Sequence, residues 1–118
     1  MRHRISKRKL NRKPAHLKMM LANLATSIIL YEEVTTTEAK AKAVKPLVDR
    51  LIARVKGKEK YIAIRYLNAR VPDPLASKKI MEVLLDRYKD RPSGFTSLTK
   101  KGFRKGDGAP IVTIKLVA

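Results

Sequence analysis

Apolar residues recur at helical spacing along most of the chain. The first set follows Pro14 at intervals of three, four and seven positions and consists of Leu17, Met20, Leu21, Leu24, Ile28 and Tyr31. Proline suits the first turn of a helix, because the N–H that it lacks would have no intrahelical partner there. The pattern therefore predicts a core helix that begins at Pro14.

A second helix is predicted after a short extended segment at residues 34–36. Thr35, Thr36 and Thr37 each suit its N-cap, and Glu38 places an acid in its first turn. One face of this helix is an apolar stripe of Val44, Leu47, Val48, Leu51, Ile52 and Val55. The opposite face carries Lys42, Lys45, Asp49 and Lys56. Within the helix, Pro46 should remove one hydrogen bond and cause a bend, and Gly57 should end it.

Two further helices are predicted in the middle of the chain. The third covers about residues 59–69, because the residue before Pro72 avoids helical geometry. Asp73 followed by Pro74 is typical of the cap and first position of a fourth helix. That helix turns Ile80, Met81, Leu84 and Tyr88 inward, and residues 92–94 end it.

Two extended segments complete the fold. Residues 95–100 and 111–117 are β-branched or aromatic runs, and the second alternates, with Val112, Ile114 and Leu116 on one face. Turn-rich residues 102–110 connect them. We predict an α+β fold in which about four helices pack on one face of a small three-stranded sheet, as a single globular domain over residues 14–118.

The net charge of the chain predicts the kind of partner that it binds. The chain has 28 lysines and arginines against 10 acids, a net charge of +18 that solubility does not require, so we expect a polyanion to bind it. Apolar residues still make up 44% of the chain, enough for a packed core. Residues 1–13 contain only three large apolar side chains, Met1, Ile5 and Leu10. We expect these thirteen residues to form an extended basic N-terminal arm that is disordered until it binds.

Basic residues gather in two places. The arm and the start of the first helix carry Arg2, His3, Arg4, Lys7, Arg8, Lys9, Arg12, Lys13, His16 and Lys18. The second group lies in and directly before the connector of the two C-terminal strands and consists of Lys100, Lys101, Arg104 and Lys105. Such residues bind phosphates and release counterions, which makes affinity depend on salt. The alternatives are a solvated charge run or a targeting peptide for the arm, and an ordinary solvated loop for the second group.

Other kinds of chemistry find little support in the sequence. The chain has no cysteine, and His3 and His16 lack the spacing and the companions of a metal site. The glycine-rich loop is followed by Pro110 and a strand, whereas a nucleotide cradle needs a helix there. The longest uncharged stretch, residues 19–31, is too short and too polar to span a membrane. We expect no enzyme activity, cofactor, metal or small-molecule substrate.

The aromatic residues divide into two groups. The four tyrosines occupy helical positions compatible with the core: Tyr31, Tyr61, Tyr66 and Tyr88. Phe95 and Phe103 lie where stacking on a base is conceivable, but the sequence contains no aromatic platform of the kind that single-strand binders use.

Several short motifs together resemble the bacterial large-subunit ribosomal protein 17 family. They are Met1-Arg2-His3-Arg4, Leu10-Asn11-Arg12, His16, Asn23-Leu24-Ala25, Thr35-Thr36-Thr37, Ala39-Lys40-Ala41, Lys101-Gly102-Phe103-Arg104-Lys105-Gly106-Asp107 and Ala109-Pro110. Each motif is weak alone, but they cover nearly the whole chain in the order and at the spacing of the family.

The resemblance implies a structural and assembly role in the large subunit. It implies binding to large-subunit (23S-type) rRNA on the solvent side, close to the nascent-peptide exit, with other large-subunit ribosomal proteins as neighbours. By the same resemblance, the basic opening of the family maps to Arg2, His3, Arg4, Arg12 and His16, and its loop contacts map to Arg104 and Lys105. We therefore expect a cytoplasmic protein within the ribosome. Charge alone equally suits a nucleoid-type protein that binds DNA, so this alternative stays open.

Overall fold

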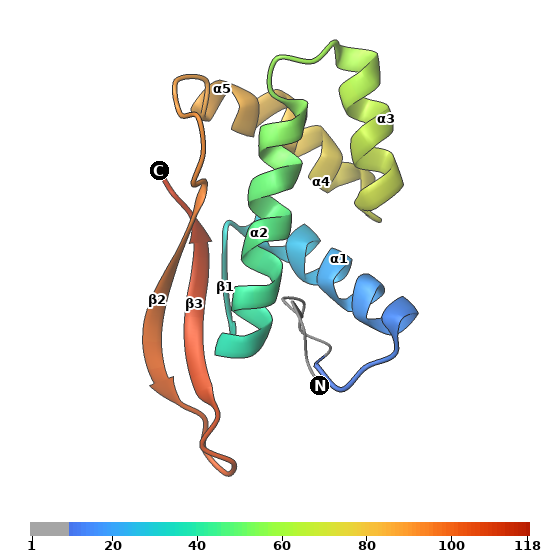
Figure 1. The fold of residues 1–118 in the computed structure, drawn as a ribbon. Coiled ribbons are helices and arrows are strands. Elements are labelled where there is room, and N and C mark those ends of the chain that lie inside the picture. Colours follow the sequence, from blue (N-terminus) through green and yellow to red (C-terminus); the bar gives the residue numbers. More distant parts are fainter. Residues whose placement is uncertain (1–9) are drawn as a thin grey trace, which may run out of the picture.

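Helices and strands of the chain follow one another in the order that the hydrophobic pattern predicts. The structure is a computed structural model that describes residues 10–118. Its elements are α1 (Pro14–Tyr31), β1 (Glu33–Thr37), α2 (Glu38–Val55), α3 (Lys60–Arg70), α4 (Pro74–Lys79), the π-helical segment η1 (Ile80–Leu84), α5 (Leu85–Arg87), β2 (Thr96–Phe103) and β3 (Pro110–Leu116) (Figure 1). Since α4, η1 and α5 are continuous in sequence, they form the single fourth helix that was predicted, with a π-helical turn in its middle.

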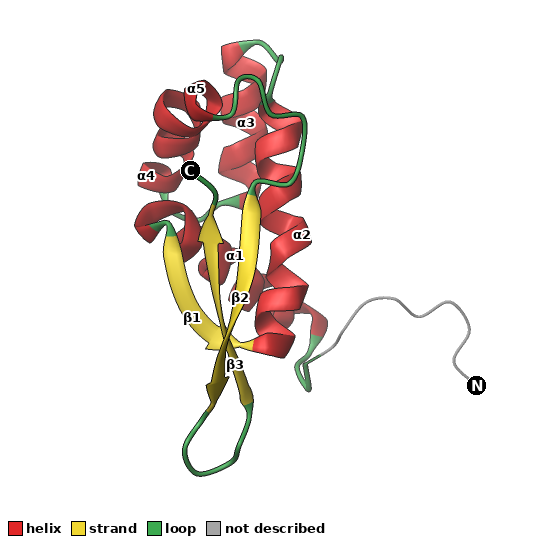
Figure 2. Cartoon of the chain, turned by 90° about the vertical axis from the view of Figure 1, so that its left-hand side faces the viewer, coloured by secondary structure: helices red, strands yellow, loops and turns green. Residues whose placement is uncertain are grey.

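The three strands form one antiparallel sheet with β3 at its centre, in the order β1-β3-β2. Val112, Ile114 and Leu116 alternate along β3 and are buried, as predicted. Figure 2 shows α1 and α2 behind this sheet, α3 and the fourth helix beyond one end of the strands, and the other face of the sheet open. The α+β architecture expected from the sequence is therefore confirmed.

Local sequence signals explain where the helices begin and end. Pro14 and Pro74 each occupy the first position of a helix, and the Asp73 carboxylate accepts a hydrogen bond from the Leu75 N–H at 2.9 Å. The helix α2 runs through Pro46 and ends at Val55, before Gly57 with its φ of +77°. Thr37 takes the N-cap position of α2, but its side chain makes no capping hydrogen bond among the described residues.

The core lies between α2 and its neighbours. Five side chains on one stripe of α2 are almost fully buried: Val44, Val48, Leu51, Ile52 and Val55. The rings of Tyr88 and Phe95 belong to the same buried core and pack with their centroids 5.0 Å apart. Each of these side chains contributes about 1.5–3 kcal/mol to folding through its burial, so this packing is a main source of the stability of the fold.

The buried face of α1 differs from the predicted stripe. It is centred on Ala25, Ile28 and Ile29, while the side chain of Tyr31 is 74% exposed. The helix is apolar around most of its circumference, so periodicity alone does not single out one face. The small Ala25 lets the helix approach its neighbours closely there.

Two further aromatic expectations were wrong. Tyr61 is 62% exposed, because it lies two residues before the buried Ala63 and therefore on the opposite side of α3. Phe95 is fully buried, so it is not available for stacking on a base. Phe95 directly precedes β2, which begins at Thr96, and its ring packs against the ring of Tyr88 at the end of the fourth helix.

Asp49 also departs from its predicted role as part of a solvent-facing stripe. Its carboxylate accepts hydrogen bonds from the Phe95 N–H at 3.2 Å and from the Thr96 hydroxyl at 3.0 Å. The same side chain pairs with Lys45 at 3.1 Å. Asp49 therefore fastens the start of β2 to α2, where a backbone donor needs a partner.

Candidate nucleic-acid interface

The first described residues place part of the predicted basic surface at the start of α1. Lys13, His16 and Lys18 are exposed, and Arg12 is half-buried, with its guanidinium donating to the Leu10 carbonyl oxygen at 2.7 Å. The remaining members of this predicted group lie outside the described residues: Arg2, His3, Arg4, Lys7, Arg8 and Lys9.

These cations are not there to stabilise the helix. The first turn of α1 contains no acidic residue, and Lys13 at the N-cap makes no side-chain capping bond. A helix N-terminus carries partial positive charge. Basic side chains beside it therefore destabilise the helix by roughly a few tenths of a kcal/mol, whereas acidic side chains would stabilise it. The start of α1 is therefore suited to receive an anion from outside the chain.

The second basic group lies on the β2–β3 hairpin, which extends beyond the helices (Figures 1 and 2). Lys100, Lys101, Arg104 and Lys105 are all exposed. The register of the ladder shifts between Lys100 and Gly102, so Lys101 is the extra residue of a bulge. Gly102 adopts a φ of +141°, which a residue with a side chain rarely does.

The tip of the hairpin is ordered by Asp107. Its carboxylate accepts hydrogen bonds from the Arg104 Nε at 3.1 Å and from the Ala109 N–H at 3.2 Å. The hydrogen bond from Arg104, followed by that from the Ala109 backbone, lowers the pKa of Asp107 from 3.8 to about 2. Arg104 is thus partly neutralised by Asp107 and shapes the loop. Among the described residues, the other three cations of the hairpin have no acidic partner: Lys100, Lys101 and Lys105.

The sequence holds a signal for this pair that was not used. Arg104 and Asp107 are three residues apart in a glycine-containing turn, and aspartate at such a position typically bonds the backbone two residues on. A second unused signal is the four-residue spacing of Arg50 and Arg54, both exposed, which places them along one side of α2. The basic surface is therefore wider than the two predicted groups.

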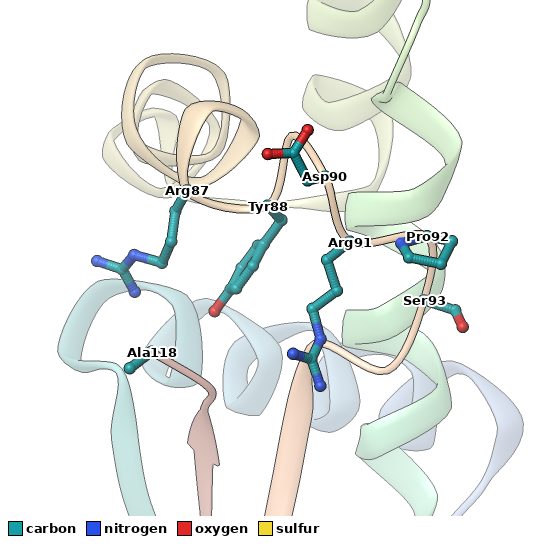
Figure 3. Close-up of a pocket in the computed structure, with 7 residues that line it drawn as sticks. All are labelled: Arg87, Tyr88, Asp90, Arg91, Pro92, Ser93 and Ala118. Carbon is teal, nitrogen blue, oxygen red and sulfur yellow. The ribbon is translucent and has the colours of Figure 1, made fainter.

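A hollow of about 470 Å³ lies at the other end of the molecule, beside the end of the fourth helix (Figure 3). It contains two arginines, but both have partners within the protein. Arg87 pairs with Glu32, and the Arg91 Nε donates to the Gly94 carbonyl oxygen at 2.9 Å. The Tyr88 hydroxyl donates to the Val117 carbonyl oxygen at 2.5 Å. These groups hold the C-terminal segments together.

Residues 10–118 contain no group of three or more histidine, cysteine, aspartate or glutamate side chains placed to hold a metal ion. In the same part of the chain, no helix has the length and apolar character that crossing a bilayer requires.

Comparison with known proteins identifies the family. A family model described as ribosomal protein L17 matches residues 20–117. This chain belongs to the ribosomal protein L17 family. The resemblance seen in the sequence motifs is thereby confirmed.

Individual members of the L17 family match almost the whole chain. The large ribosomal subunit protein bL17 of Hyphomonas neptunium is 46% identical over 117 residues, which are 99% of this chain and 83% of that protein. The bL17 protein of Orientia tsutsugamushi is 45% identical over 99% of this chain and 80% of its own length. That of Ehrlichia canis is 43% identical, over 99% of this chain and 91% of its own length.

Proposed function

We propose that this protein is a structural constituent of the large ribosomal subunit. In this role it binds and stabilises large-subunit (23S-type) rRNA close to the nascent-peptide exit, contacts neighbouring large-subunit ribosomal proteins, and works in the cytoplasm as part of the ribosome. Similarity to large ribosomal subunit proteins along nearly the whole chain supports this assignment.

The observation that carries the rRNA-binding part is the placement of lysines that have no acidic partner among residues 10–118. Lys100, Lys101 and Lys105 project on a hairpin away from the core, and Lys13 and Lys18 lie exposed at the start of α1. Each lysine that neutralises a phosphate strengthens binding without reading sequence. We propose that residues 1–13, most of which lie outside the described part, add to this surface as a basic arm attached to the domain of residues 14–118.

The role that we propose is mechanical rather than catalytic. A protein that contacts phosphates from two separated places holds the RNA segments between them in one arrangement. The carboxylates with partners in the described fold, such as Glu32 with Arg87 and Asp49 with Thr96, join elements of the protein to one another. This suits a scaffold for rRNA folding and assembly.

A competition assay between fragments of folded large-subunit rRNA and duplex DNA tests the proposal. We expect the rRNA fragments to displace DNA, and the triple variant Lys100→Gln, Lys101→Gln, Lys105→Gln to bind rRNA with a shallower salt dependence. Each lost phosphate contact reduces the slope by about 0.7–0.9 log units per log unit of salt.

A control variant distinguishes the effect of the position of the lysines from the effect of the total charge of the protein. Lys60→Gln, Lys78→Gln, Lys89→Gln removes the same charge from exposed lysines on α3, on α4 and in the turn after α5, away from the hairpin. It should retain the slope of the unmodified protein. Preference for duplex DNA would favour the nucleoid-type alternative, and equal losses in both triple variants would contradict a localised rRNA surface.

A further inference from the structure

Phe103 is the most exposed large apolar side chain among the described residues. With 77% of its surface accessible, it contributes little to the core. The other phenylalanine, Phe95, is fully buried. Of the two phenylalanines that the sequence offers for stacking on a base, only Phe103 has an accessible ring in the structure.

The bulge determines the direction in which Phe103 faces. Lys100 pairs with Val112 and Phe103 pairs with Pro110, and directly opposed residues of an antiparallel ladder lie on the same face. Val112 and Pro110 are two residues apart, so Lys100 and Phe103 share one face of the hairpin. In a regular strand they would lie on opposite faces, because they are three positions apart in the sequence. The extra residue Lys101 thus brings an aromatic ring and a cation together.

Gly102 allows this arrangement. It is paired with Ile111 on the other face, and its φ of +141° absorbs the distortion of the bulge. An ideal Cβ at Gly102 would meet no atom within 4 Å, so its backbone conformation, and not crowding, is the reason for glycine there.

The surroundings of Phe103 indicate the chemistry of its partner. Lys101, Arg104 and Lys105 follow or precede the ring within two residues, and all three are exposed. Docking an apolar protein surface on the ring would take these cations out of water at a substantial cost. A nucleotide suits both features, because it offers a flat base to the ring and phosphates to the lysines on either side of it.

We propose that Phe103 stacks on an unpaired nucleobase of the rRNA while the lysines on either side bind the adjoining phosphates. This inference rests on the proposed rRNA-binding function and adds a contact with a base to what is otherwise recognition of the backbone. A base stacks on an aromatic ring only when it is unpaired and turned out of its own stack, so the site selects a loop or bulge of the RNA.

Binding of the full chain to two RNA probes of about 12 nucleotides, the length of an extended single-strand site, tests this. One probe is single-stranded oligoadenylate and the other is a blunt-ended duplex. Phe103→Ala should weaken binding of the single strand about fivefold to a hundredfold. Its salt dependence should not change, because no charge is lost, and binding of the duplex should not change either.

Three further variants distinguish stacking from other roles. The protein contains no tryptophan, so Phe103→Trp introduces a single reporter that should keep the affinity and lose fluorescence when the base stacks on it. Phe103→Leu keeps an apolar side chain without a ring and should bind as weakly as Phe103→Ala. Tyr61→Ala removes a comparably exposed ring from α3 and should bind as the unmodified protein does.

Two results would overturn the inference while leaving rRNA binding intact. One is equal binding of the single strand by the unmodified protein, Phe103→Ala and Phe103→Leu. The other is full affinity in Phe103→Leu with weak binding in Phe103→Ala, which would indicate an apolar contact instead of stacking. If the unmodified protein binds neither RNA at low salt, the proposed function fails as well.

Discussion

The Glu32 carboxylate accepts a hydrogen bond at 3.1 Å from the Nζ of Lys79, which lies 47 residues later in the chain. The same Nζ donates to the Leu30 carbonyl oxygen at 3.1 Å, so Lys79 caps the C-terminal end of α1. Arg87 pairs with the other carboxylate oxygen of Glu32. The backbone of Glu32 is tied as well, because its carbonyl oxygen accepts from the Leu116 N–H at 2.9 Å. One residue therefore joins α1, the fourth helix and β3.

This arrangement predicts a pH-dependent contribution of Glu32 to stability. The hydrogen bonds from Arg87 and then Lys79 lower its pKa from 4.5 to about 2. Because the pKa is lower in the folded state, the contribution is complete above pH 4.5 and disappears as the pH falls toward about 2. The side chain is 39% exposed, so after screening by solvent we expect Glu32→Gln to cost no more than about 1 kcal/mol at neutral pH.

Urea unfolding at a series of pH values measures this effect. The difference between the unmodified protein and Glu32→Gln should shrink between pH 4.5 and about 2. Glu33→Gln, which changes the exposed neighbouring carboxylate, is the control and should show no such trend. A difference that stays constant across this range would show that the ion pairs of Glu32 do not stabilise the fold.

Asp49 should matter more to stability than its position on the polar side of α2 indicates. Asp49→Ala leaves the Phe95 N–H and the Thr96 hydroxyl without their acceptor, which costs about 1–3 kcal/mol when such donors are buried. The free energy of unfolding measures the loss. Asp86→Asn, on an exposed carboxylate of α5, should stay within about 0.5 kcal/mol of the unmodified protein. Equal effects of the two changes would refute the fastening role of Asp49.

Gly102→Ala tests the geometry of the hairpin. A side chain at a φ of +141° is strained, and we expect a cost of about 1–3 kcal/mol. The strain should appear locally, as faster amide hydrogen exchange in β2 and β3 with the helices unaffected. Exchange rates identical to those of the unmodified protein would mean that the bulge does not require glycine.

Removing residues 1–13 should leave a folded domain. The fully buried core of the described chain begins only at Ala25, well inside α1. We expect a cooperative thermal transition together with weaker rRNA binding and a reduced salt slope, because the basic residues of the arm are lost. Loss of the cooperative transition would show instead that these residues belong to the folded core.

Features that depend on neighbours in the sequence were predictable. Pro14 and Asp73-Pro74 mark helix starts because caps act within one turn, and the alternation of Val112, Ile114 and Leu116 follows from the two faces of a strand. The exposed basic loop at residues 104–105 was likewise predictable, because it lies in a glycine-rich turn.

Features that depend on distant partners were not predictable. The sequence indicates a strand near Lys100, but the bulge at Lys101 exists only relative to the register of β3. Glu32 and Glu33 are adjacent in the sequence, but only Glu33 belongs to β1, whereas Glu32 precedes the strand in a left-handed conformation with a φ of +63°. Its partners Lys79 and Arg87 are brought to it only by packing of the fourth helix against α1.

Sedimentation with ribosomal subunits tests the central claim most directly. The full-length protein, mixed with large subunits that lack it, should travel with them through a sucrose gradient at low salt and be released only by high salt or by digestion of the rRNA. The hairpin variant Lys100→Gln, Lys101→Gln, Lys105→Gln should be released at lower salt than the control variant Lys60→Gln, Lys78→Gln, Lys89→Gln. If the unmodified protein stays at the top of the gradient at low salt, the account of a large-subunit scaffold is wrong.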